Sequence, residues 1–405
     1  RSTDATFVNF APLTDDWKTA LADVRGVIAD AITNPPTQEE IDREAAEFSV
    51  IFENQVEQES VQAGSTLADN IVNAVDIRET VAAPKVVRDV FRDMKDRLVP
   101  DQVLERTKAL FEGDVVRSVY VTPKAGEADI SALRVALASD VAVDASARLA
   151  AKTVDFSDLP PIGNPGVTVS QQPLGIFEID QIEYANGVRA MLWANNAEPG
   201  RVTVRVRFGS GYRAFDSDTA VYAPLGEAAL FGSGIGELGQ DELDRLATGR
   251  KLGFAFAVED AVFSFTAQTR ASDVEDQLYL FAAKLGMPSW DADPVIRTKA
   301  GAQLAYKTYA TSPSGVLNRD LQYLATDKDP RFATPDPEAL ERVTPEKFRE
   351  VWEPLLQQGP VEVLVFGDYD KASLITKLSQ TFGALPARKP IPAAALARLP
   401  RFPSA

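Results

Sequence analysis

Residues 359–368 carry the sequence GPVEVLVFGD, and residues 381–386 carry TFGALP. The apolar run in the first stretch predicts a buried strand, and residues 371–382 predict the helix that returns from it. A threonine followed by a proline opens residues 344–356, which is typical of a helix N-terminus. A strand between two helices is expected in a sheet that has helices packed against it.

The residues before this stretch continue the mixture of strands and helices. Residues 201–208 alternate strictly, with apolar side chains on one face and Arg201, Thr203, Arg205 and Arg207 on the other, which predicts a half-buried strand. Residues 254–269 predict a hairpin that turns at residues 259–260. Helices are expected over residues 219–231, 240–248, 274–285, 295–309 and 316–325. The order places the chain in the α+β class, with mostly antiparallel sheets packed against helices.

The first section is predicted to be mainly helical. Apolar residues recur at helical spacing over residues 17–32. Thr37 followed by Glu40 forms a capping box that begins a second helix, and Pro84 opens a third. Two short strands are expected over residues 5–10 and 115–121, where apolar residues cluster or alternate.

Proline and glycine mark two irregular stretches. Residues 153–185 contain Pro160, Pro161 and several further prolines and glycines, which break regular structure. The stretch is long for a loop inside a compact domain, so we expect an interdomain linker. A second linker is expected after Arg388, where the sequence is rich in proline and alanine.

The chain of 405 residues contains no histidine and no cysteine. It therefore lacks the commonest general base, the commonest zinc ligands and the Ser-His and Cys-His pairs of nucleophilic enzymes. The net charge of −17 disfavours nucleic acid as a partner, and no apolar run is long enough to span a membrane. Because the chain starts at Arg1 without a methionine, we expect an excised or processed piece of a longer protein.

Several motifs resemble one family of zinc peptidases, the insulinase/pitrilysin family. The strand that ends in residues 367–368, the helix after it and FGALP at residues 382–386 resemble the end of a domain in that family. The opening of the domain is matched by NGVR at residues 186–189 and by GSG at residues 209–211. PTQEEI at residues 36–41 is similar to a helix start in the family's second domain.

The resemblance implies a domain organisation. Members have two homologous halves, each of two similar α+β domains, which enclose a chamber for unfolded peptides. Residues 1–130 would be the later portion of the second domain, 131–183 an irregular linker, 184–390 the inactive third domain, and 391–405 a tail leading to a missing fourth domain. The first domain, which carries the zinc motif in active members, would precede this chain.

No catalytic residue and no metal ligand are predicted here. Active members carry His-x-x-Glu-His and a distal glutamate in their first domain. The corresponding helix of the third domain is expected over residues 222–231, where Glu227 is present without a flanking ligand. A catalytic zinc site needs three protein ligands, so we expect no cofactor in this chain and zinc in the missing domain.

The glycines of residues 234–239, GIGELG, match the spacing of a dinucleotide-binding loop. Glu259 stands where a ribose-binding acid would be. Such a site needs a strand directly before the glycines, and here a helix end is expected. A loop after a helix is therefore the favoured interpretation.

Two groups of acidic residues also have a functional and a structural interpretation. Asp241, Glu242 and Asp244 would bind a cation or, as favoured, stabilise a helix N-terminus. Asp368 would be catalytic at a strand end or, as favoured, would cap the helix that begins at Lys371.

Arg205 and Arg207 are the predicted substrate-chamber contacts. They lie on the polar face of a strand that the resemblance places beside the chamber, where they would bind main-chain carbonyls or acidic side chains. The alternative is an ordinary exposed sheet face.

The leading hypothesis is a noncatalytic chamber-forming segment of an insulinase-family zinc metallopeptidase that degrades peptides. Its partners would be an unfolded or extended peptide and the missing sister domains of the same polypeptide, with no nucleic acid and no membrane span. The alternative is a nonenzymatic scaffold or interaction subunit homologous to such peptidases, and a third hypothesis is an independent enzyme that uses carboxylates and a hard metal ion. The sequence leaves the compartment open, and the resemblance suggests export to a bacterial periplasm.

Overall fold

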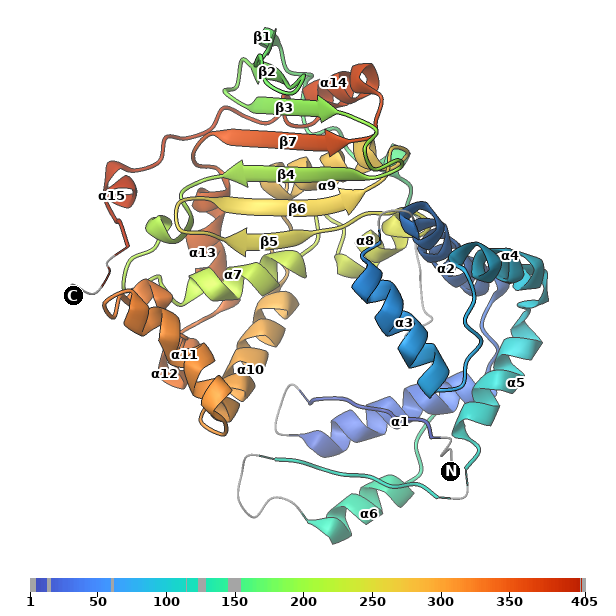
Figure 1. Cartoon of the computed structure of the whole chain (residues 1–405). Coiled ribbons are helices and arrows are strands. Elements are labelled where there is room, and N and C mark those ends of the chain that lie inside the picture. The colour runs from blue at the N-terminus through green and yellow to red at the C-terminus, as the bar shows by residue number, and fades with distance from the viewer. Residues whose placement is uncertain are drawn as a thin grey trace. The chain divides into compact units, whose positions relative to one another are not determined.

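The structure is a computed structural model that describes residues 5–12, 16–59, 62–113, 115–122, 129–144, 154–400 and 402 (Figure 1). The chain divides into two compact units, Arg1–Lys152 and Thr153–Ala405.

The described part of unit 1 is helical, as predicted. Its core is small and includes Leu21 of the first helix and Ile41 and Ala45 of the second. The capping box is confirmed, because Thr37 accepts from the amide of Glu40 at 3.2 Å and the Glu40 carboxylate accepts from the amide of Thr37 at 2.7 Å. The elements are α1 Trp17–Thr33, α2 Gln38–Gln58, α3 Gly64–Asp76, α4 Pro84–Met94, η2 Lys95–Arg97, α5 Pro100–Phe111 and α6 Ile130–Ala138.

The two strands expected in unit 1 are not formed. Residues 5–12 and 115–122 are extended without belonging to a sheet, so the prediction of strands over residues 5–10 and 115–121 is wrong for this structure. A strand needs a hydrogen-bonded neighbour in a sheet, and among the described residues the seven-stranded sheet of unit 2 includes neither stretch. Helices α3, α5 and α6 were not predicted from the sequence.

Unit 2 is built on one seven-stranded mixed sheet with the order β1-β2-β3-β7-β4-β6-β5. Neighbouring strands are antiparallel except for β3 and β7, which are parallel. The predicted hairpin is confirmed as β5 and β6. The strands are β1 Thr168–Pro173, β2 Asp180–Tyr184, β3 Arg189–Ala194, β4 Val202–Phe208, β5 Ala255–Val258, β6 Phe263–Thr269 and β7 Val361–Gly367.

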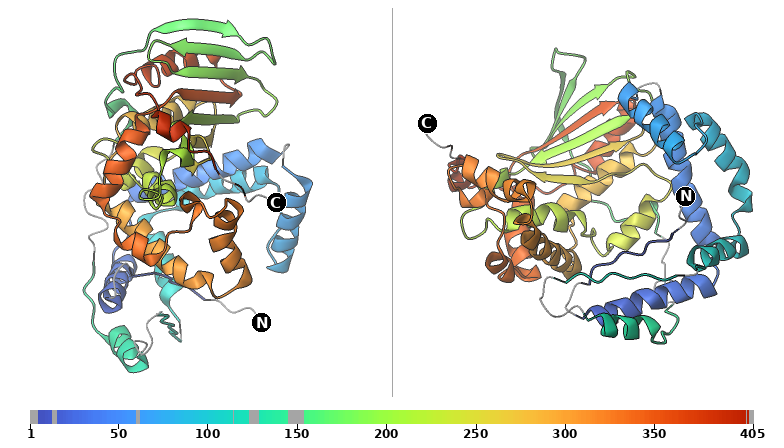
Figure 2. Two further views of the ribbon diagram at one scale, coloured as in Figure 1. Left: turned by 90° about the vertical axis from the view of Figure 1, so that its left-hand side faces the viewer. Right: turned by 60° about the horizontal axis from the view of Figure 1, so that its bottom comes forward.

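Helices of unit 2 cover one face of this sheet. In Figure 1, α9 and α13 lie behind the strands, and Figure 2 shows the same layers from two other sides. The helices are α7 Tyr222–Phe231, α8 Gln240–Ala247, α9 Val274–Gly286, α10 Ala292–Tyr309, α11 Pro313–Ala325, α12 Pro337–Glu341, α13 Pro345–Leu356, α14 Lys371–Gln380 and α15 Ala393–Leu396, with short 3-10 turns η4 Phe156–Asp158, η5 Gly211–Ala214 and η6 Pro330–Phe332.

The core lies between the sheet and these helices. Every second residue of β4 and β7 is buried there, as the alternation in the sequence predicts. Trp352 of α13 is fully buried and donates to the carbonyl of Tyr222 at 3.0 Å. Gly226 permits this approach, because a Cβ at that position would lie 2.0 Å from the Trp352 ring. The helix pair α7–α13 therefore depends on a glycine at the crossing.

The two stretches expected to be linkers contain regular elements. The stretch 131–183 is not irregular throughout, because it contains most of α6 in unit 1 and β1 of the unit 2 sheet. The expected tail 391–405 includes α15, and Arg331 donates to the carbonyl of Arg398 at 2.8 Å. Its described part therefore packs on unit 2. Among the described residues, no helix has the length and apolar character needed to cross a membrane.

Candidate functional site

The face of the sheet opposite the core carries a row of paired charges across three adjacent strands. Arg189 of β3 and Arg207 of β4 both donate to Glu362 of β7, at 3.2 and 3.3 Å. The strand register places the three residues side by side, because each arginine is the direct partner of Glu362. One carboxylate therefore holds two guanidinium groups. We name Arg189, Glu362 and Arg207 the charged row.

Arg205 lies on the same face and has a different partner. Its guanidinium is 2.5 Å from the carboxylate of Glu259, which also accepts from the Ser264 hydroxyl at 2.6 Å. The hydrogen bond from Ser264, and to a smaller extent the one from Arg205, hold the pKa of Glu259 below its ordinary value. The side chains of Arg205 and Arg207 are 42% and 41% exposed. Both arginines therefore remain accessible although each is paired.

The far end of the same face is aromatic. The ring centroids of Trp193 and Phe366 lie 6.4 Å apart. Phe177, in the loop between β1 and β2, packs on Trp193 with ring centroids 5.7 Å apart. Phe177 is exposed. We name Phe177, Trp193 and Phe366 the aromatic end. An extended polypeptide on this face would meet charged donors at one end and apolar rings at the other.

Glu227 stands on α7 as the sequence predicts, and it has a structural partner. Its carboxylate accepts from the backbone amide of Val258 at 2.8 Å. Val258 belongs to β5, which is an edge strand of the sheet. Burial raises the pKa of Glu227, although the hydrogen bond from Val258 acts in the opposite direction. The carboxylate therefore satisfies an edge-strand amide.

The surroundings of Glu227 do not fit a zinc site. The positions three before and one after it, where the family motif has its histidines, are Pro224 and Ala228. Among the residues that the structure describes, no group of three or more histidine, cysteine, aspartate or glutamate side chains is arranged to hold a metal ion. No step of metal chemistry can be derived from this helix.

The glycine-rich stretch 234–239 is a tight turn. It follows helix α7 and not a strand, and the amide of Ile235 donates to the carbonyl of Leu238 at 3.0 Å. The amide of Gly236 donates to the carbonyl of Met287. Glu259, the acid expected for a ribose, is paired with Arg205. The stretch thus lacks the strand that a dinucleotide site requires.

The acidic residues of α8 take part in local hydrogen bonds. The Glu242 carboxylate accepts from the amide of Gly239 at 3.0 Å, and the Asp244 carboxylate accepts from the Gln240 side chain at 2.7 Å. The first contact caps the helix N-terminus, and the second is a side-chain pair four residues apart on the helix surface. Asp241 is exposed in the same turn. This arrangement matches the favoured structural interpretation.

The predicted role of Asp368 needs correction. The helix α14 is capped by Asp370, whose carboxylate accepts from the amide of Ser373 at 2.7 Å. Asp368 instead accepts from the amide of Gly200 at 3.1 Å. It therefore fixes the loop that leads into β4. Asp368 and Asp370 both precede the helix in the sequence. Which of them caps it depends on the direction that the chain takes after Gly367.

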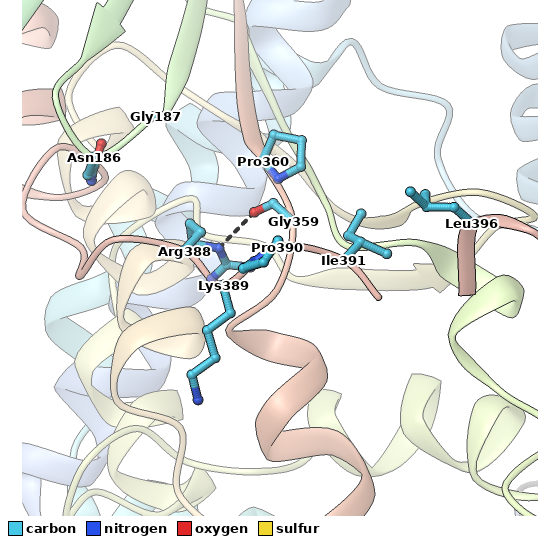
Figure 3. A pocket seen from close by; sticks show the side chains of 9 residues that line it. All are labelled: Asn186, Gly187, Gly359, Pro360, Arg388, Lys389, Pro390, Ile391 and Leu396. Carbon is cyan, nitrogen blue, oxygen red and sulfur yellow. Dashed lines mark hydrogen bonds between the residues drawn. The ribbon is translucent and has the colours of Figure 1, made fainter. Parts of the chain in front are cut away.

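The motifs that carry the family resemblance meet in space. The Asn186 side-chain amide donates to the carbonyls of Phe382, Gly383 and Leu385 at 2.9 to 3.0 Å. Arg388 donates to the carbonyl of Gly359 at 3.1 Å (Figure 3). The motifs are evident in the sequence, but their contact with each other is not, because about 195 residues separate Asn186 from its partners. The opening and closing motifs of the domain are thus joined by hydrogen bonds.

A hollow of about 470 Å³ lies beside these motifs and is lined by Asn186, Gly187, Gly359, Pro360, Arg388, Lys389, Pro390, Ile391 and Leu396. The Arg388 guanidinium also donates to the carbonyls of Leu356 and Gln358. Burial lowers the pKa of Arg388 to about 10. Its donors are therefore already used by the backbone, and we assign this hollow to the architecture of the domain.

Comparisons with known proteins identify the fold. No protein-family model matches the chain, and no curated protein sequence matches it either. Among solved structures, the periplasmic protease PqqL from Escherichia coli aligns at 14% identity and a TM-score of 0.53, covering 91% of this chain and 41% of that one. An E83A mutant of the ferredoxin protease FusC, in complex with Arabidopsis ferredoxin, aligns at 14% identity and a TM-score of 0.53, covering 93% and 42%.

The chain therefore spans about two-fifths of the length of these two proteases. The alignments include both units and show the α+β architecture that the sequence predicts. The chain has the fold of this group of proteases, to which the insulinase-type motifs of residues 186–189 and 382–386 already pointed.

Proposed function

We propose that residues 1–405 form a noncatalytic, chamber-forming segment of an insulinase-type zinc metallopeptidase that degrades peptides. The observation that carries the proposal is the open face of the unit 2 sheet, with its charged row, Arg205 and its aromatic end. An extended peptide would accept hydrogen bonds from Arg205 and Arg207 through carbonyl or carboxylate oxygens. Its apolar side chains would contact Trp193 and Phe366.

Hydrolysis would take place in a different domain. This chain has no histidine or cysteine, and its Glu227 carboxylate is engaged by the amide of Val258. Zinc bound in a separate domain would supply the activated water. The role of this chain would be to hold an extended substrate. The fold neighbour PqqL is described as periplasmic, and we propose a similar exported location here.

The test replaces Arg205 and Arg207 by glutamine in the full chain. Charge reversal is unsuitable, because it would place a glutamate beside Glu259 and another beside Glu362. Fluorescence anisotropy would measure the binding of a labelled, unstructured acidic peptide. We expect the Kd to rise about fivefold to tenfold, since two partly exposed charge-assisted donors are lost.

The matched control is Arg349→Gln on helix α13. Arg349 forms an ion pair with Glu353 at 3.1 Å and does not belong to the sheet. This variant should bind the peptide as the unchanged chain does. An equal Kd for R205Q/R207Q and the unchanged chain would contradict the proposal. Peptide cleavage by the full-length protein with zinc, and none by residues 1–405, would favour the peptidase over the scaffold alternative.

A further inference from the structure

The turn that joins strands β1 and β2 has an unusual backbone conformation. Phe177 and Glu178 have φ angles of 51° and 56°, which lie in the left-handed region. The amide of Ile179 donates to the carbonyl of Ile176 at 3.1 Å, so Phe177 and Glu178 occupy the two central positions of a tight turn. Asparagine and glycine are preferred at such positions, and a bulky residue there is an outlier. The backbone of this turn is therefore strained.

The strained turn also exposes apolar side chains. Those of Ile176 and Phe177 are 60% and 71% exposed. Neither the strain nor the exposure of these side chains stabilises unit 2. Strained backbone conformations cluster at binding sites, where they hold a side chain in a position that the site requires. The position of the Phe177 ring is therefore the feature to explain.

The turn holds the Phe177 ring at the aromatic end of the open sheet face. The β1–β2 hairpin lies beside β3 in the sheet (Figure 1). Trp193 of β3 contacts the Phe177 ring on one side and the Phe366 ring on the other, the latter edge to face. Trp193 and Phe366 are half-buried, so all three rings keep exposed surface. A fourth ring placed here would find the centroid separations of about 4.5 to 7 Å that aromatic pairs prefer.

Two arginines of β4 lie at a fixed spacing from the aromatic end. Phe366 is the direct partner of Thr203. Arg205 and Arg207 follow Thr203 by two and four residues on the same face, which corresponds to about 7 and 13 Å along the strand. Extended strands that pack face to face stay within about 30° of each other. An extended peptide that places one residue on the aromatic end therefore brings the residues two and four positions away near the two arginines.

We propose that the aromatic end binds one aromatic side chain of the peptide, and that acidic residues two and four positions from it contact Arg205 and Arg207. This inference rests on the proposed function and specifies the class of substrate that the face selects. Phe177 is the specificity-determining residue, because the strained turn supplies the third ring. Side chains at odd positions of an extended peptide point away from the face.

The test compares three labelled nine-residue peptides by fluorescence anisotropy with the full chain. The first, Glu-Ser-Glu-Ser-Phe-Ser-Glu-Ser-Glu, carries acids two and four positions from the phenylalanine on both sides, so either direction of binding is served. The second has alanine in place of the phenylalanine. The third, Ser-Glu-Ser-Glu-Phe-Glu-Ser-Glu-Ser, has the same composition as the first with the acids at odd positions. We expect the Kd of the first peptide to be about fivefold lower than that of either other peptide.

The double variant Phe177→Asn/Glu178→Gly tests the strained turn. Asn-Gly is the favoured pair in such a turn, so the melting temperature should rise by about 2 °C. The preference for the first peptide over the second should nevertheless be lost, because the third ring is missing. Glu178→Gly alone relieves part of the strain, keeps the ring and should bind as the unchanged chain does. Loss of binding together with a gain in stability distinguishes a binding role of Phe177 from a structural one.

Two results would overturn the proposal. One is an equal Kd for the first and second peptides on the unchanged chain, a comparison that needs no variant to fold. The other is a preference for the first peptide that persists in the double variant. The Arg205→Gln/Arg207→Gln chain separates these results from the proposed function. If its Kd rises equally for two peptides that the unchanged chain does not distinguish, the face holds peptides and only the aromatic preference is wrong. If no peptide binds the unchanged chain, the proposed function fails as well.

Discussion

At the scale of single residues, Lys284 is the strongest case of a buried charge with a structural role. Its side chain is 7% exposed and its ammonium group donates to the carbonyls of Leu230, Phe231 and Ser233. These carbonyls lie at the C-terminal end of α7, where backbone acceptors lack helical partners. The ammonium also lies 4.9 Å from the ring of Phe254. Lys284 therefore joins α9 to the end of α7.

We expect Lys284→Met to destabilise unit 2 by about 1 to 3 kcal/mol at neutral pH, because three carbonyls, of which those of Leu230 and Ser233 are buried, lose their donor. Burial lowers the pKa of Lys284 to about 8, from an ordinary 10.5. At a pH between these two pKa values, the unfolded chain binds more protons than the folded chain. The free energy of unfolding of the unchanged chain therefore rises with pH in this range. Urea denaturation at neutral and alkaline pH should show the gap to the variant widening.

The control is Lys299→Met, since Lys299 donates to the carbonyls of Glu341 and Val343 at a more exposed position. Its effect on the free energy of unfolding should be smaller. A Lys284→Met variant as stable as the unchanged chain at every pH would mean that the carbonyls find other donors.

At the scale of elements, the edge strand β5 depends on Glu227 of α7. Because burial raises the pKa of Glu227, the folded chain binds a proton at this carboxyl more strongly than the unfolded chain does. Stability is therefore lost as the pH rises through the folded pKa. Glu227→Gln keeps an acceptor for the Val258 amide and stays neutral, so its melting temperature should exceed that of the unchanged chain at about pH 8.

The advantage of Glu227→Gln should shrink at about pH 5, where the native carboxyl is more protonated. Glu227→Leu provides the comparison, because it removes the acceptor and leaves the Val258 amide without a partner, which should lower the melting temperature at both pH values. Equal melting temperatures for all three chains would show that the contact between α7 and β5 contributes nothing.

Local sequence predicts those elements whose signals are local. The capping box at Thr37 and the N-cap at Thr344 are both confirmed. They are predictable because each involves residues within one helical turn. Strand β1 was missed within the expected linker, because its partner β2 supplies the reason for it to form. The candidate site shows the same limit: Arg207 is predictable as a polar-face residue, but its partner Glu362 lies 155 residues away.

At the scale of the whole molecule, the two units differ in how they are stabilised. The core of unit 2 contains large, fully buried side chains, among them Trp352, Phe263 and Phe281, and its sheet is complete with seven strands. In the described part of unit 1, Leu21 and Ile41 are among the few buried apolar residues, and Phe7, Val116 and Val119 are more than 80% exposed. Burial of apolar surface is the main stabilising contribution to folding.

We therefore expect residues 153–405, produced alone, to fold with the same melting temperature as the corresponding transition of the full chain. Residues 1–152 alone should melt without a cooperative calorimetric peak, since few of their described apolar side chains are buried. A cooperative calorimetric peak from residues 1–152 alone would contradict this expectation, because it would mean that these few buried side chains suffice as a core.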